Sequence, residues 1–333
     1  MKAAVIGAGG WGTALAVLLA GKGYPVSLWM RRPELYKKIL LKRSNEEYLP
    51  GIKLPDTIRP TVELEEALHD KNFVLFAVPS HGLRAVAAAA VPYLPPRAVL
   101  VNAAKGLVEP GGLRLSQLLK AALPVERHDQ IAVISGPNHA EEVSRGLPSA
   151  TVAASTAPGT ALLVQEALMT SYFRVYTHSD LTGVELGGAL KNVIALGAGI
   201  VDGLKLGDNA KAALVTRGLA EMTRLGAALG ACASTFSGLS GLGDLYATCS
   251  SPHSRNRDVG CRLGRGERPG EITAAMKTVA EGINTTRVAA GLARRAGVEM
   301  PITTALHGVL FEALPPQQAV ERLMEREKKA ENG

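Results

Sequence analysis

The stretch Lys2-Ala-Ala-Val-Ile-Gly-Ala-Gly-Gly-Trp-Gly12 begins as an apolar run and ends as a glycine-rich turn, and residues 13–20 continue it with a helical pattern. A short apolar run is typical of a buried parallel strand. Gly7, Gly9 and Gly12 match the spacing G-x-G-x-x-G, whose glycines permit a tight turn, a close approach of pyrophosphate and close helix–strand packing. The phosphate would lie against free N–H groups where the helix begins. A glycine turn can be purely structural, but its position between strand and helix favours dinucleotide binding.

Six further apolar runs predict strands of the same sheet: residues 25–30, 72–78, 98–102, 131–135, 149–154 and 173–177. Beyond residue 181 the pattern becomes helical, over 183–201 and again over 209–229. A chain of 333 residues is long enough for two domains. We therefore expect a Rossmann-type α/β domain over residues 1–180 and an all-α domain over residues 181–333.

The composition narrows the classes of partner. The net charge of +7 weakly favours an anionic ligand, but Lys and Arg are dispersed among acids, which argues against nucleic-acid binding. The three cysteines, Cys232, Cys249 and Cys261, lack CxxC spacing, so neither a disulfide framework nor a metal site is expected, and a reducing cytoplasmic compartment fits. No secretory signal pattern is present, and apolar stretches such as residues 85–94 are too short to span a bilayer, so we expect no stable membrane insertion.

Residues 183–199 form one long apolar helix that carries Lys191 and Asn192 in its middle. At helical spacing around Lys191 lie the small residues Gly187, Gly188 and Ala195, which would let another body approach closely. Lys191 could face a substrate, or it could be a solvated lysine on an amphipathic helix, and the helix alone favours the solvated interpretation.

Two arginines follow the second predicted strand. A cofactor with a free ribose 2′-hydroxyl usually meets Asp or Glu at this position, but Arg31 and Arg32 stand here. A guanidinium suits a 2′-phosphate, so the sequence predicts that NADPH is preferred over NADH. The alternative is that both arginines are merely solvated.

Ligands of open α/β sheets collect at the carboxyl ends of strands, where Lys105, Gly136, Asn138 and Ala140 are placed. His139 lies among them and could be a general acid or base. It directly precedes Glu141 and Glu142 in a predicted helix start, which favours a structural role.

The glycine-rich residues 235–248 suggest backbone held close to a ligand or another helix. Within them, Asp244 could accept a hydrogen bond from a lysine, or it could be an ordinary acid at a helix start. Ser254 could cap the next helix. Arg255 and Asn256 would then occupy its first turn, where arginine suits a bound phosphate better than the usual acidic bias does. Glu281 lies in a loop predicted before a helix over 283–296, and a solvated carboxylate is the default interpretation.

The chain as a whole resembles bacterial NAD(P)-dependent glycerol-3-phosphate dehydrogenases. The motifs that carry the resemblance are Gly7-x-Gly-x-Trp-Gly12, Tyr48-Leu-Pro-Gly51, Val78-Pro-Ser80, Lys105-Gly106, Ser135-Gly-Pro-Asn-His-Ala-Glu-Glu-Val143, residues 183–192, Gly207-Asp-Asn-Ala-Lys-Ala-Ala-Leu214, Gly241-Leu-Gly-Asp244, His253-Ser-Arg-Asn256 and Val279-Ala-Glu281. The resemblance implies a 6-phosphogluconate-dehydrogenase-like arrangement, with the site between a nucleotide-binding domain and a helical domain. It also overrides the solvated interpretation of Lys191.

The resemblance implies site residues as well. Lys191 would be the proton acceptor. The substrate would meet Lys105, Gly136, Asn138, Lys191, Asp244, Ser254, Arg255 and Asn256. The cofactor would meet the glycine turn and Gly10, Trp11, Arg31, Arg32, Tyr48, Lys105, Ala140, Arg255, Val279 and Glu281. Departures from the family's common pattern are Gly10 in place of serine, Asn138-His139 in place of Ser-Phe, and Arg31 in place of histidine.

The implied reaction moves a hydride between nicotinamide and C2 of a phosphorylated three-carbon substrate and supplies glycerol 3-phosphate for phospholipid synthesis. Lys191 would exchange the proton of the C2 oxygen if its pKa is lowered toward neutrality. Lys105 would lower that pKa and Asp244 would raise it, so the sequence leaves the balance open. Asp244 and Asn192 would orient Lys191, assisted by Thr248, while Arg255 and Asn256 would anchor the phosphate. The family also implies a homodimer.

Three other functions remain as alternatives. A ketopantoate-reductase-type or 2-hydroxyacid dehydrogenase would share the glycine turn and a helix lysine, but not the combination of Gly241-Leu-Gly-Asp244 with Ser254-Arg-Asn256. A non-catalytic dinucleotide sensor would bind cofactor without turnover. A nucleic-acid binder would associate with polynucleotide in a salt-sensitive manner.

Overall fold

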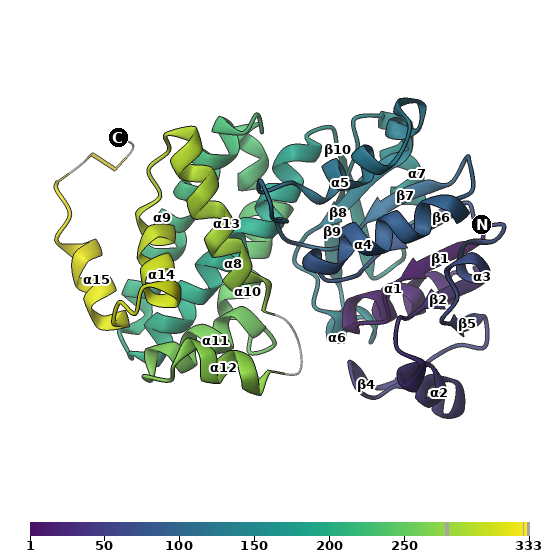
Figure 1. The fold of residues 1–333 in the computed structure, drawn as a ribbon, viewed down its shortest axis with the longest axis horizontal. Coiled ribbons are helices and arrows are strands. Elements are labelled where there is room, and N and C mark those ends of the chain that lie inside the picture. Colours follow the sequence, from purple (N-terminus) through teal and green to yellow (C-terminus); the bar gives the residue numbers. More distant parts are fainter. Residues whose placement is uncertain (277–279, 329, 332–333) are drawn as a thin grey trace.

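The computed structural model describes residues 1–276, 280–328 and 330–331. It contains an α/β domain followed by a helical domain, which lie side by side along the long axis of the molecule (Figure 1). The predicted fold class is therefore confirmed.

The sheet of the first domain has eight strands in the order β10-β9-β8-β7-β6-β1-β2-β5. Their bounds are β1 Ala3–Ile6, β2 Val26–Trp29, β5 Ile58–Thr61, β6 Phe73–Phe76, β7 Val99–Asn102, β8 Ile131–Ser135, β9 Ser149–Ala154 and β10 Phe173–His178. Strands β8 and β9 are antiparallel, and the other neighbouring pairs are parallel. The chain passes from β1 to β2 on one side and returns to β6 on the other, and ligands bind at such a switch point.

Strand β5 was not predicted from the sequence. Its residues Ile58-Arg-Pro-Thr61 include a proline, which cannot donate to a ladder hydrogen bond. The strand lies at the edge of the sheet beside β2, where proline is tolerated. Two other strands, β3 Ser44–Asn45 and β4 Leu49–Lys53, form a separate antiparallel pair.

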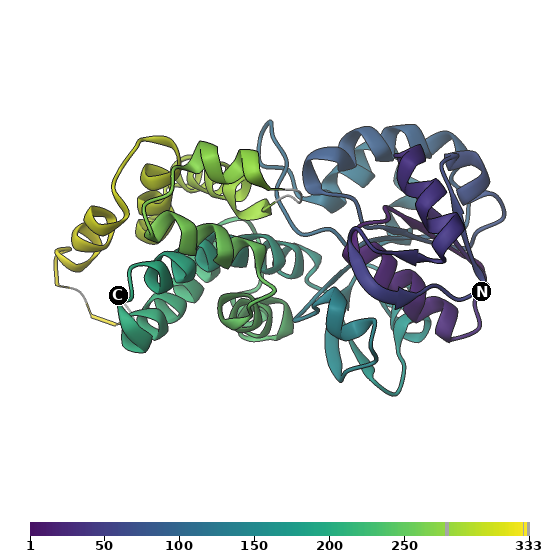
Figure 2. The same ribbon diagram turned by 90° about the horizontal axis from the view of Figure 1, so that it is seen from below.

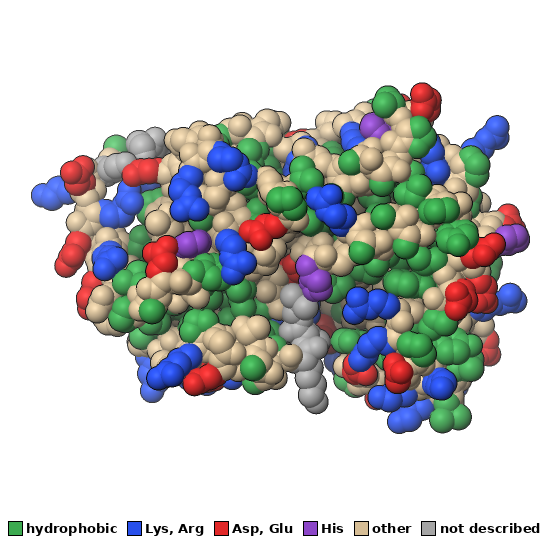
Figure 3. Space-filling view, in the orientation of Figure 1, with side chains coloured by type: hydrophobic (Ala, Val, Ile, Leu, Met, Phe, Trp, Pro, Cys, Tyr) green, Lys and Arg blue, Asp and Glu red, His purple; other side chains and the backbone are tan. Residues whose placement is uncertain are grey.

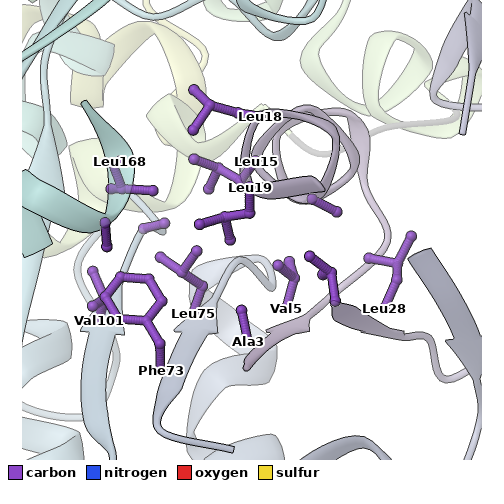
Figure 4. Close-up of a cluster of buried hydrophobic side chains, with 14 of the residues drawn as sticks. Ala3, Val5, Leu15, Leu18, Leu19, Leu28, Phe73, Leu75, Val101 and Leu168 are labelled. Atoms are coloured by element: carbon purple, nitrogen blue, oxygen red, sulfur yellow. The ribbon is translucent and has the colours of Figure 1, made fainter. Parts of the chain in front are cut away.

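Helices cover both faces of the large sheet (Figure 2). They are α1 Gly10–Gly21, α2 Pro33–Lys42, α3 Leu64–Leu68, α4 Ser80–Ala90, α5 Leu115–Ala122, α6 Ala140–Val143 and α7 Pro158–Leu168, with 3₁₀ turns η1 Val91–Tyr93 and η2 Val125–Gln130. Alternate strand residues point to opposite faces, so Ala3 and Val5 join one buried cluster and Ala4 and Ile6 another. In the first cluster Leu15 and other side chains of α1 pack onto the sheet (Figure 4).

The glycine turn has the expected close packing. Gly7 adopts φ +120°, which an L side chain rarely adopts, and a Cβ there would lie 2.7 Å from the Ala77 carbonyl oxygen. A Cβ at Gly12 would overlap the carbonyl oxygen of Gly7. A Cβ at Gly9 would meet no protein atom within 4 Å. The first and third glycines therefore fold the turn, while the second leaves its backbone open to an approaching group.

The second domain is helical. Its elements are α8 Leu181–Gly203, α9 Gly207–Ala228, η3 Ala233–Ser237, the π turn η4 Leu239–Gly243, α10 Asp244–Ser250, α11 Arg255–Gly264, α12 Pro269–Ala275, α13 Glu281–Ala296, α14 Pro301–Phe311 and α15 Pro316–Met324. Helix α8 is long and apolar enough to cross a membrane, but its apolar window is completely buried inside the protein. It is the core helix of this domain.

Helices α8 and α11 cross with their backbones in contact. A Cβ at Gly260 would overlap the Leu196 carbonyl oxygen, and one at Gly199 would overlap the Arg257 carbonyl oxygen. One turn further along, a Cβ at Gly264 would lie 2.6 Å from the Ile200 carbonyl oxygen. Glycine at these positions therefore brings the beginning of α11 beside the middle of α8.

Candidate active site

A cleft of about 480 Å³ lies where the two domains meet. It is lined by the glycine turn, by the carboxyl ends of strands β1, β2, β6, β7 and β8, and by helices α8, α10 and α11. The predicted residues in its lining are Gly7, Gly9, Gly10, Trp11, Arg31, Arg32, Tyr48, Lys105, Asn138, Lys191, Asn192, Asp244, Thr248, Ser254, Arg255, Asn256 and Glu281. Gly12, Gly136 and Ala140 lie just outside the lining, and Val279 falls outside the described residues.

Lys191 is buried at the floor of this cleft, with 6% of its surface exposed. Its Nζ donates to Asp244 Oδ1 and, at 2.7 Å, to Thr248 Oγ1. Lys105 reaches the same carboxylate from the first domain, since its Nζ lies 2.7 Å from Asp244 Oδ2 and 2.8 Å from the Gly136 carbonyl oxygen. The solvated interpretation of Lys191 is therefore wrong. Asp244 is the shared partner of two amines rather than a plain acid at a helix start.

Burial lowers the pKa of Lys191 from its ordinary value of 10.5 to about 7. The Asp244 carboxylate opposes this effect, and the Lys105 ammonium adds to the lowering. The balance that the sequence left open therefore favours an amine that can both accept and release a proton near neutral pH. General acid–base catalysis is most efficient when the pKa lies close to the working pH.

The small residues around Lys191 admit other parts of the protein. A Cβ at Gly187 would lie 2.6 Å from the Ser240 carbonyl oxygen in η4. A Cβ at Gly188 would overlap Ser135 Oγ at the end of β8 and lie 3.5 Å from Lys105 Cγ. The close approach expected from the sequence is thus made by η4 and the first domain, which bring Lys105 to Lys191.

Helix α11 begins at the cleft, as the sequence predicted. Ser254 is its N-cap, and the Ser254 hydroxyl accepts a hydrogen bond from the Arg257 N–H at 3.2 Å. Asn256 Nδ2 donates to Asn192 Oδ1, and the Gly282 N–H donates to Asn256 Oδ1, both at 2.9 Å. Asn192 therefore orients Asn256 rather than Lys191, which corrects the direct role expected for it.

The two arginines on the cofactor side have different surroundings. Arg32 forms an ion pair with Glu47 and lies over the Tyr48 ring, 5.5 Å from its centroid. Arg31 is exposed, and within the described ranges it has no ion pair or hydrogen-bonding partner. A Cβ at Gly10 would lie 2.8 Å from the Tyr48 carbonyl oxygen, which explains the glycine there. Glu47, 15 residues beyond Arg32, was not singled out in the sequence.

Glu281 begins helix α13 two residues earlier than predicted, and its carboxylate is not simply solvated. One of its oxygens accepts the Ser80 N–H at 2.9 Å, and the other accepts the Ser80 hydroxyl. The carboxylate therefore lies at the N-terminus of α4, where the helix dipole favours negative charge. Ser80 had no role assigned from sequence. The only signal for it was the motif Val78-Pro-Ser80.

His139 lines the cleft directly before helix α6, and its ring centroid lies 5.9 Å from that of His253. Burial, reinforced by the positive charge of Lys191, lowers the pKa of His139 below its ordinary value. Asn138 Nδ2 donates to the carbonyl oxygens of Pro137 and Ala150, at 3.0 and 2.8 Å. Among the described residues no group of three or more His, Cys, Asp or Glu side chains is arranged to hold a metal ion.

Two protein-family models match this chain, one over the α/β domain and one over the helical domain. Residues 2–161 match the model for the N-terminus of NAD-dependent glycerol-3-phosphate dehydrogenase, and residues 180–321 match the model for its C-terminus. A curated relative from Pelotomaculum thermopropionicum, glycerol-3-phosphate dehydrogenase [NAD(P)+], is 51% identical over 98% of this chain and 94% of its own. Its counterpart from Chlorobium limicola is 50% identical over 99% of both chains.

Solved structures agree. The crystal structure of glycerol-3-phosphate dehydrogenase from Coxiella burnetii has a TM-score of 0.93 at 39% identity, covering 98% of this chain and 99% of that one. A ketopantoate reductase of Ralstonia eutropha reaches a TM-score of 0.59 at 16% identity, covering 96% of this chain and 100% of that one, so it shares the fold alone.

Proposed function

This chain belongs to the NAD-dependent glycerol-3-phosphate dehydrogenase family, and from that premise we propose how its cleft performs the reaction. The enzyme interconverts dihydroxyacetone phosphate and glycerol 3-phosphate with NAD(P)(H). The observation that carries the proposal is the ion-paired group of buried Lys191, buried Asp244 and partly buried Lys105, which lines the same cleft as the glycine turn and the beginning of α11.

The nicotinamide cofactor, when bound, supplies or accepts the hydride. The turn fits its pyrophosphate, because Gly9 leaves the backbone open and α1 begins directly behind it. The residues that would contact the cofactor all line the cleft: Gly7, Gly9, Gly10, Trp11, Arg31, Arg32, Tyr48, Lys105, Arg255 and Glu281. Gly12 supports the turn, because its lack of a side chain lets it pack against the Gly7 carbonyl oxygen.

The proton moves at Lys191 Nζ. In oxidation the neutral amine takes the proton of the substrate's C2 hydroxyl, and in reduction the ammonium returns it. Asp244 and Thr248 fix the direction of the amine by hydrogen bonds. The Lys105 ammonium stabilises negative charge that develops on the C2 oxygen. Ser254, Arg255 and Asn256 at the beginning of α11 hold the phosphate and so place C2 against the amine.

The test of the reaction is NADPH oxidation with dihydroxyacetone phosphate, run beside pyruvate and ketopantoate. We expect turnover with the phosphorylated ketone and at most about a hundredth of it with the others, because these lack the phosphate that α11 binds. Equal turnover with ketopantoate would move the enzyme to the related dehydrogenase class. Cofactor binding without any turnover would indicate a sensor.

Replacing Arg255 with alanine should raise the KM for dihydroxyacetone phosphate about a hundredfold, because a charge-assisted contact to the phosphate is lost. The KM for the cofactor is measured in parallel, since Arg255 also faces the cofactor side. Arg262→Ala on the same helix is the matched control, because Arg262 pairs with Glu267 away from the cleft. An unchanged substrate KM in Arg255→Ala would place the phosphate elsewhere.

We propose that NADPH is preferred and that Arg31 is the residue that recognises the 2′-phosphate, because the Arg32 guanidinium is already paired with Glu47. Arg31→Ala should lower kcat/KM for NADPH between about 10- and 100-fold and leave the value for NADH unchanged. Arg59→Ala, on edge strand β5 outside this cleft, is the control. Equal losses with both cofactors would contradict the assignment.

We also propose a domain division, a compartment and an oligomeric state for this enzyme. Residues 1–180 and 181–333 form the two functional domains, and β10 ends at His178 while α8 begins at Leu181 in support of that boundary. We place the enzyme in the cytoplasm, where it makes glycerol 3-phosphate for phospholipid synthesis. We also propose that it is a homodimer. Light scattering of the purified protein tests the dimer. On the face drawn in Figure 3, basic and acidic side chains are intermixed, which supports a small-molecule partner over nucleic acid.

A further inference from the structure

The loop that carries Lys105, residues 103–114, leaves β7 and extends over the second domain before α5 begins (Figure 1). The side chain of Asn284 donates to the Leu107 carbonyl oxygen at 3.2 Å, and that of Arg295 donates to the Gly111 carbonyl oxygen at 2.9 Å. Both donors lie on α13. A catalytic loop of the first domain is therefore positioned by contacts with the second.

The end of this loop is fixed by a carboxylate on α8. Glu185, six residues before Lys191 in the same helix, accepts the Ser116 N–H at 2.7 Å and the Ser116 hydroxyl at 2.5 Å. It also accepts a hydrogen bond from Arg114 Nη1 at 3.0 Å. Glu185 is buried, and burial raises its pKa against the opposing effect of these donors. A carboxylate that forms three such bonds holds its partners in a single arrangement.

Helix α8 therefore carries both the general base and the group that anchors the loop of Lys105. We propose that Glu185 is a positioning residue of the reaction, which holds loop 103–114 so that the Lys105 ammonium stays at the Asp244 carboxylate. The proposal rests on the function proposed above.

The position of Lys105 matters because of the charges around Lys191. Three groups face Lys191: Asp244 on α10, Lys105 on the loop and His139 in the first domain. The buried Cys249 thiol also lies nearby on α10. When loop 103–114 loosens, Lys105 leaves Asp244, and the carboxylate then acts on Lys191 alone. Its attraction favours the ammonium, so the pH at which Lys191 becomes a base should rise.

The second domain contains a matched control for this carboxylate. Glu221 on α9 is also buried, and burial raises its pKa as well. It accepts the N–H groups of Ile302 and Thr303, at 2.6 and 3.2 Å, and the Thr303 hydroxyl at 3.1 Å. It caps α14 and does not line the cleft. Loss of either carboxylate removes similar bonds, but only Glu185 touches the loop of Lys105.

The experiment compares Glu185→Gln with Glu221→Gln. We measure kcat for glycerol 3-phosphate oxidation against pH, cofactor binding by fluorescence, and thermal stability. Glu185→Gln should move the acidic limb of kcat upward by about one pH unit, which lowers turnover about tenfold on that limb, while the cofactor still binds. Glu221→Gln should lower thermal stability and leave the limb in place. An unmoved limb in Glu185→Gln, or equal shifts in both variants, would overturn the proposal.

Arg114→Lys serves if Glu185→Gln does not fold, because its side chain is partly exposed and lysine keeps the charge. It should move the limb in the same direction by a smaller amount, and no movement would count against the proposal. Failure of the proposed function can be distinguished from failure of the Glu185 proposal. In that case the wild-type enzyme itself, or its Lys191→Ala variant, would not behave as described below.

Discussion

Replacing Lys191 with alanine is expected to lower kcat about a thousandfold in both directions, while the cofactor still binds. The reason is that the Lys191 amine, whose pKa is lowered to about 7, exchanges the proton of the C2 oxygen, and general acid–base groups contribute about 10²–10⁴ in rate. In the wild type, turnover in the oxidation direction should fall as the pH drops below about 7, because burial lowers the pKa of Lys191 to about 7 and only the neutral amine is a base. The variant should lose that acidic limb.

The fold should survive this replacement. Asp244 keeps its ion pair with Lys105 at 2.7 Å, so no buried charge is left without a partner. Lys211→Ala is the matched control, because Lys211 also pairs with a carboxylate, Asp202, on α8 but does not line the cleft. Turnover, cofactor affinity and thermal unfolding are measured for both variants. Near-normal turnover of Lys191→Ala would remove Lys191 from the mechanism.

The elements predicted well from sequence are those whose signal is local. The apolar runs of β1, β6 and β8 and the glycine turn can each be recognised from a few consecutive residues. Edge strand β5 was missed because Pro60 and Arg59 break the apolar run, and only its pairing with β2 makes it a strand.

The site residues likewise divide into those whose partners are close in the sequence and those whose partners are distant. Ser254 was found as a helix cap because its partner, Arg257, is three residues away. By contrast, Lys191 meets Asp244 across 53 residues, and Ser80 meets Glu281 across 201. Sequence proximity says nothing about such pairs, so the helix alone favoured a solvated Lys191, and Ser80 and Glu47 were given no role. The family motifs supplied the residues of the site but not their hydrogen-bonding partners.

Replacing Gly260 with alanine is expected to lower the free energy of unfolding by at least about 3 kcal/mol, which is large for one methyl group. The added Cβ would overlap the Leu196 carbonyl oxygen, so α11 must move away from α8, and backbone atoms cannot rotate aside as a flexible side chain can. Urea unfolding measures the change, which appears as a lower midpoint at unchanged slope.

Gly291→Ala on α13 is the matched control, and it should raise the free energy of unfolding instead of lowering it. A Cβ there would meet only the end of the Arg295 side chain, at 3.5 Å, so the helix gains about 0.5–1 kcal/mol without a clash. Because α11 begins with Ser254 and Arg255, its displacement in Gly260→Ala should also raise the KM for dihydroxyacetone phosphate at temperatures where the variant remains folded. Equal stability of the two variants would mean that α8 and α11 are not in backbone contact. A lower stability with an unchanged KM would mean that the phosphate is held independently of that crossing.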